Sequence, residues 1–68
     1  MSKGAIEQAL EAFIAEAKKT GLDIDGVAVK AKAGILGNDI YSWISTTEKT
    51  KAIDALEKAV SEITKLNI

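Results

Sequence analysis

One stretch decides the fold: residues 32–46 read KAGILGNDIYSWIST and contain the only tryptophan and the only tyrosine of the chain. Its apolar side chains recur at intervals of three and four, the spacing of one helix face, at Leu36, Ile40, Trp43 and Ile44, followed by Thr47. Its polar side chains form the opposite stripe, at Asn38, Asp39, Ser42, Ser45 and Thr46. A strand would need strict alternation, which is broken here. The pattern predicts a short amphipathic helix over residues 37–46, entered through a turn at 33–35, as in a helix-turn-helix.

Composition limits the chemistry that this chain of 68 residues can perform, because it contains neither cysteine nor histidine. Disulfides, thiol chemistry, the usual transition-metal ligands and the commonest acid–base side chain are therefore excluded. No glycine loop suited to phosphate stands out, and no pair of carboxylates does either. We expect a single domain over residues 1–68 that is not an enzyme and has no cofactor, metal or small-molecule substrate.

The sequence contains no apolar run near the ~18–20 residues of a membrane span, and no signal peptide is visible at its start. A cytoplasmic, membrane-free protein is the resulting expectation. Net charge is −1, which counts against nucleic acid as a partner. The central residues 26–51 are nevertheless mildly basic, with four lysines against two acidic residues. That patch fits either a modest phosphate-binding surface or a solvated surface with no partner.

Two long amphipathic helices flank the central stretch. The first is expected over residues 3–20, capped by Ser2 and ended by Gly21, with its apolar stripe at Ile6, Ala9, Leu10, Phe13, Ile14 and Ala17. The last is expected over residues 48–66, with Ser45 and Glu48 in a capping box and a stripe at Ile53, Leu56, Ala59, Val60, Ile63 and Leu66. Both helices are expected to form the core.

Residues 26–36 fit two different structures. Helical spacing relates Ile24, Val27, Ala28, Ala31 and Ile35, and the alanines favour a helix. The segment 27–33 also alternates, so it could pair through a turn at Gly37-Asn38 with a second strand over 39–45. The favoured fold is all-α, a bundle of four to five helices that contains a helix-turn-helix. The alternative is an α+β fold of the form helix–β-hairpin–helix.

The central segment resembles the lambda-repressor-like helix-turn-helix family. Ala33-Gly34-Ile35 matches the turn of that family, while Val29, Ile40 and Trp43 lie five before, six after and nine after the turn glycine, at the family's buried positions. The resemblance covers about residues 20–64, with the long helix from Glu48 in the place of the family's next helix. It departs from the family at Lys30, where alanine is preferred, and at Leu36, where a small polar cap is usual.

The resemblance implies a repressor-like transcription regulator that binds double-stranded DNA, with residues 37–46 in the major groove. Trp43 and Ile40 would anchor that helix in the core. The expected base contacts come from Asn38, Asp39, Ser42 and Ser45. The expected phosphate contacts come from Lys30, Lys32, Tyr41, Thr46, Lys49 and Lys51. The alternative for these residues is structural: Asn38 and Asp39 cap a helix, and the lysines are solvated.

Two expectations concern partners. Useful DNA affinity from so small a domain would need a homodimer, held together by the acidic outer helices or the apolar tail at 66–68. The rival to DNA binding is a small protein-binding or structural module, such as a phage-like assembly or inhibitory protein.

Overall fold

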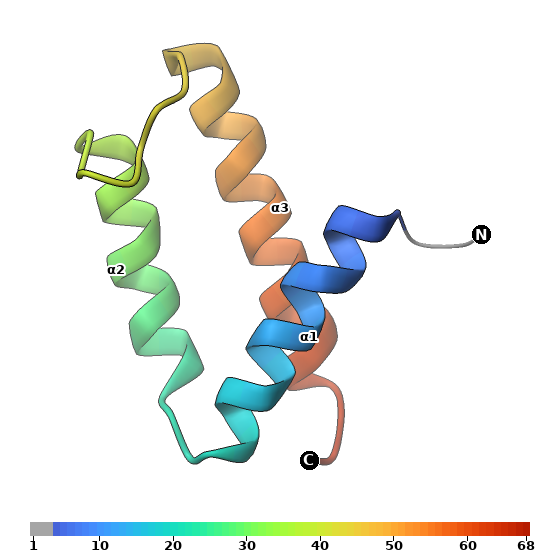
Figure 1. Cartoon of the computed structure of the whole chain (residues 1–68). Helices are drawn as coiled ribbons and strands as arrows, with labels where there is room; N and C mark the ends of the chain where they lie inside the picture. The colour runs from blue at the N-terminus through green and yellow to red at the C-terminus, as the bar shows by residue number, and fades with distance from the viewer. Residues whose placement is uncertain (1–3) are drawn as a thin grey trace.

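The structure is a computed structural model that describes residues 4–68, which form three α-helices (Figure 1). They are α1 (Ala5–Lys19), α2 (Ile24–Leu36) and α3 (Thr46–Thr64). Residues 4–68 contain no strand, so the all-α class is confirmed and the β-hairpin alternative is wrong. Three helices replace the expected four to five. The predicted cap Ser2 and helix start at Lys3 lie outside the described residues.

Local chemistry accounts for the helix ends. The side chain of Asp23 accepts a hydrogen bond from the Gly26 amide at 3.2 Å and caps α2, and the Ser45 hydroxyl accepts from the Glu48 amide at 3.4 Å and caps α3. Beyond the C-terminus of α1, Gly21 adopts a φ of 89°, a left-handed conformation that glycine takes without steric cost. These signals are local in sequence, which is why the predicted helices over 3–20 and 48–66 agree with the structure to within two residues at their described ends. Residues 26–36, which fit either a helix or a strand, lie in α2.

Helix α3 holds the molecule together. It packs against both α1 and α2, whereas those two helices have few contacts with each other. In Figure 1, α2 and α3 run side by side in opposite directions, and α1 crosses the C-terminal half of α3 while diverging from α2. The arrangement therefore leaves much of the surface of α1 and of α2 without a neighbouring helix.

The core is correspondingly small. Ile14 of α1 packs with Ala59 and Ile63 of α3, and partly buried side chains surround them at Leu10, Ala15, Ile24, Leu56 and Val60. The chain exposes 5097 Å² of surface, about 1,000 Å² more than the about 4,100 Å² that the scaling of monomer surface with mass gives for 7.2 kDa. Large apolar side chains stay exposed on α1, on α2, in the segments that join the helices and after α3, Ile6 and Phe13 of α1 among them.

The predicted recognition helix is wrong: residues 37–45 form turns and bends between α2 and α3. Asn38 has a φ of 58°, and the Asp39 amide donates to the Gly34 carbonyl at 2.9 Å, so the chain reverses directly after α2. Ile40 and Trp43 were expected in the core but are 88% and 85% exposed. A helix of about ten residues is unstable without tertiary packing, and here the apolar face of this segment finds no core to pack against.

Candidate functional site

The best-defined local structure outside the core is the α2–α3 loop, residues 37–45. Lys49 in the first turns of α3 is buried, and its ammonium donates to the Leu36 carbonyl at 3.3 Å and to the Asn38 side-chain oxygen. The Ser42 hydroxyl donates to the Ile35 carbonyl at 2.9 Å. The loop is thus bonded at its start to the end of α2 and to α3, which fixes its path although it has no regular structure.

Tyr41 adds a packing contact to these bonds. Its hydroxyl end lies directly over the backbone of Gly34, so closely that a Cβ at position 34 would overlap the tyrosine ring. The glycine was predicted as a helix-turn-helix turn; it lies instead inside α2, where it gives room to Tyr41.

The four predicted base-contacting residues all have bonding roles within the chain. Asn38 accepts from Lys49, Ser42 donates to the end of α2 and Ser45 caps α3. The Asp39 side chain accepts from the Ile40 amide at 2.7 Å. They lie on one loop but not on one helix face, because the helix that was to align them is absent. Their contact with DNA bases stays a prediction.

The predicted phosphate-contacting residues are distributed over α2, the loop and α3. Lys32 forms an ion pair with Glu57 at 3.6 Å, and Lys51 forms one with Glu48 at 3.4 Å. Lys30, Tyr41 and Thr46 are exposed, while Lys49 points into the loop. Most of this set therefore lies at or near the surface, whereas Lys49 is buried. Their contact with DNA phosphates stays a prediction.

Exposed apolar residues of the loop are the feature that the sequence reasoning missed. Ile40 and Trp43 project from a segment whose backbone is held by the bonds described above. Beside Trp43 lies a hollow of about 370 Å³ with almost entirely apolar walls, formed by residues of all three helices and the loop: Leu10, Ala31, Ile35, Tyr41, Ser42, Trp43, Ile44, Ala52 and Leu56. Ile40 and Trp43 have the spacing of a buried helix face, which is why the sequence predicts them in the core.

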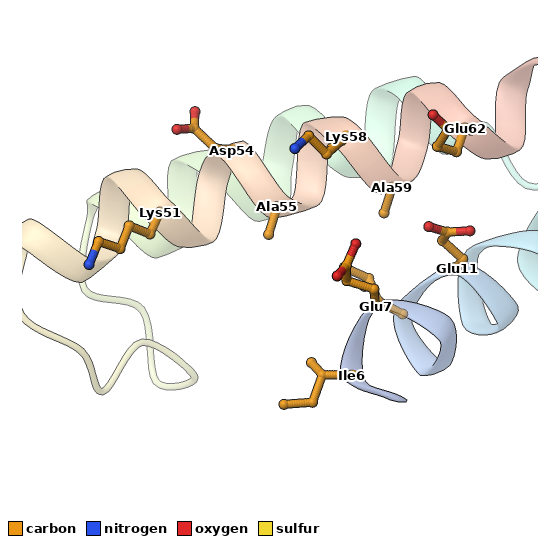
Figure 2. A pocket seen from close by; sticks show the side chains of 10 residues that line it. Ile6, Glu7, Glu11, Lys51, Asp54, Ala55, Lys58, Ala59 and Glu62 are labelled. Carbon is orange, nitrogen blue, oxygen red and sulfur yellow. The ribbon is translucent and has the colours of Figure 1, made fainter. Parts of the chain in front are cut away.

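A second depression separates the N-terminal half of α1 from α3 and has a volume of about 470 Å³ (Figure 2). Its floor contains Ala55 and Ala59, and Figure 2 shows Glu7 and Glu11 on the α1 side facing these alanines. Ile6 at its edge points away from α3. The remaining charged residues along it are Lys51, Asp54, Lys58 and Glu62. Because both acidic and basic side chains line it, this depression is a mixed-charge groove. Within residues 4–68, no group of three or more His, Cys, Asp or Glu side chains could hold a metal ion.

Comparison with protein-family models, with curated proteins and with solved structures finds no match to this chain. Among the helices described, none combines the length and the apolar character that crossing a membrane requires. Conclusions about function therefore depend on the geometry above.

Proposed function

We propose that the chain is a small protein-interaction module that presents the α2–α3 loop to a partner protein. The observation that carries the proposal is the exposure of Trp43 and Ile40 on a loop that side-chain bonds hold in place. Tryptophan is among the residues most enriched in the energetic centres of protein interfaces. The partner would supply an apolar pocket for the indole.

The bonding of the loop supports this function in a second way. A flexible loop must be ordered on binding, and that ordering weakens affinity. Here Asn38 is bonded to Lys49 of α3 and Ser42 to the end of α2, so two points of the loop are already held and less ordering is needed on binding. The apolar hollow beside Trp43 adds a recess into which a side chain of the partner fits.

The experiment compares three versions of the tagged protein expressed in its own cells: wild type, Trp43→Ala and Ile6→Ala. Ile6 is the matched control, because it is an equally exposed apolar residue on α1, remote in sequence from the loop. Proteins bound by wild type and by Ile6→Ala but lost from Trp43→Ala, as quantified by mass spectrometry, support the proposal. The purified partner should also shift the fluorescence emission of Trp43 to shorter wavelength. An identical set of bound proteins for all three versions would contradict it.

DNA binding by a repressor-like regulator stays a prediction, with less geometric support than protein binding. No helix forms over residues 37–45, and Lys49 is directed into the loop. Non-specific attraction to phosphates should persist at low salt. A mobility-shift assay at low ionic strength therefore tests it: retardation of duplex DNA that falls steeply with salt would favour the regulator, and no retardation would eliminate it.

A further inference from the structure

The apolar hollow beside Trp43 adjoins both the core and the α2–α3 loop. Two of its wall residues, Leu10 of α1 and Leu56 of α3, also pack against the buried cluster of the core. Trp43 forms another part of the wall and is itself 85% exposed. The hollow is therefore continuous with the loop surface that we propose to bind a partner protein.

Small side chains leave the hollow open. Ala31 of α2 and Ala52 of α3 both line it, and both are partly buried. A larger side chain at either position would occupy part of the space, so these two alanines set the size of the group that can enter. A dry apolar cavity of about 150 Å³ holds one benzene ring. The hollow measures about 370 Å³, which gives room for a larger ring system such as an indole.

The chemistry of the wall disfavours charged and strongly polar occupants. None of the described residues that line the hollow is charged. Of its two hydroxyl groups, that of Ser42 donates to the Ile35 carbonyl, and that of Tyr41 lies against the backbone of Gly34. A charged group would lose its hydration there without gaining an opposite charge, which is unfavourable. The group that complements this wall is therefore uncharged and apolar.

The same wall favours a side chain of a partner protein over a free small molecule. Sites for small molecules contain a few polar groups that orient the ligand, whereas the hydroxyls here already have contacts within the chain. A side chain needs no such group, because the rest of its own protein orients it. The rings of Tyr41 and Trp43 both line the hollow and add ring–ring contacts that only an aromatic occupant can make.

We propose that the hollow receives an aromatic side chain of the partner protein, and that Ala31 and Ala52 limit the size of that side chain. This inference rests on the proposed function of the loop and specifies the chemistry of its partner. Trp43 would enter a pocket of the partner while an aromatic side chain of the partner enters the hollow beside it. The two proteins would thus exchange one large side chain in each direction.

Titration of the free protein with the N-acetyl amides of tryptophan, leucine and lysine tests the chemistry of the site. We expect the tryptophan amide to shift the methyl NMR signals of Leu10, Ile35 and Leu56 saturably. The leucine amide should bind about two- to tenfold more weakly, because it makes no ring–ring contact. The lysine amide should cause no saturable shift. Absence of saturation with the tryptophan amide, or equal affinity for the leucine amide, would overturn the proposal.

Filling the hollow tests its location. Ala52→Leu should abolish binding of the tryptophan amide, whereas Ala55→Leu, the same change at an exposed position of α3 outside the hollow, should leave binding unchanged. Far-UV circular dichroism checks that both variants fold. Ala31→Leu narrows the hollow from α2 and replaces Ala52→Leu if that variant does not fold. Undiminished binding of the tryptophan amide by a folded leucine variant at position 31 or 52 would refute the site.

The outcome can be separated from that of the proposed function, because the titration requires no partner. Proteins captured through Trp43 should be lost from Ala52→Leu and kept by Ala55→Leu. If Ala52→Leu retains them, the loop remains a partner site and the role of the hollow is refuted. If the tryptophan amide binds but no protein depends on Trp43, the proposed function is refuted instead.

Discussion

Replacing Lys49 by methionine removes the ammonium that ties the α2–α3 loop to α3. Methionine retains an unbranched stem of similar length, so the variant deletes the bonds to the Leu36 carbonyl and the Asn38 side chain with little change in packing. Lys49 is 7% exposed, so water screens these bonds less than it would at the surface. The variant isolates the contribution of one buried cation to the order of the loop.

The loss of unfolding free energy that we expect for Lys49→Met follows from the surroundings of the ammonium. A hydrogen bond to a charged group contributes about 1.5–3 kcal/mol. Part of this loss is offset in the methionine variant, because folding then no longer requires the desolvation of an ammonium group. The Asn38 side chain, which is exposed, can also bond to water once the lysine is gone. We therefore expect a net loss of about 1–2 kcal/mol, which for a domain of this size lowers Tm by roughly 5–15 °C.

Thermal unfolding followed by circular dichroism measures that loss, and amide hydrogen exchange locates it. Exchange should accelerate most at the Asp39 and Ser42 amides, whose hydrogen bonds lie within the loop. Lys51→Met is the matched control, because its ammonium is exposed and pairs with Glu48 on the surface, where such pairs contribute less than about 1 kcal/mol. Equal losses for the two methionine variants, or unchanged exchange in the loop, would refute the assigned role of Lys49.

Three further predictions concern stability measured by chemical denaturation. Gly34→Ala should raise the free energy of unfolding less in the wild type than in a Tyr41→Ala background, because in the wild type the added Cβ must displace the tyrosine ring. Equal gains in the two backgrounds would contradict the contact between Tyr41 and Gly34. Ile63 is buried in the core, so Ile63→Ala should lower the free energy of unfolding by about 2–5 kcal/mol. Ile40 is 88% exposed, so Ile40→Ala should change it by less than about 0.5 kcal/mol. Similar losses for the two variants would contradict the assignment of Ile63 to the core. Ser45→Ala should cost about 1 kcal/mol by removing the cap of α3, and an unchanged stability would show that the Glu48 amide is satisfied by water.

The three helices were predictable because their signals lie within a few residues of each other. Asp23 and Ser45 are good caps, Gly21 is a good terminator, and the alanines of α2 favour helix over strand. Each of these effects acts inside one turn of chain and needs no knowledge of the tertiary fold. Residues 26–36, whose segment 27–33 also fits a strand pattern, lie in α2, in agreement with their helix propensity.

The loop was not predictable from spacing, because a three-and-four pattern says which residues would share a face without saying whether anything lies opposite that face. Ile40 and Trp43 show this most clearly, since both match a buried pattern and both are exposed. Asn38 was the available signal: after Gly37 it is a residue that tolerates positive φ, and such a pair favours a chain reversal over helix continuation. The same limit applies to α1, where Phe13 follows the stripe of Ile14 but lies on the outer side.

The central place of α3 has a consequence for how the chain is made. The first two helices contact each other little, and most of their native contacts are to a segment that is synthesised after them. A ribosome-bound chain that has emerged only as far as Leu36 therefore has no lasting tertiary partner for either helix. Native structure should appear late during translation and in one step, when the third helix becomes available to both of the others at once.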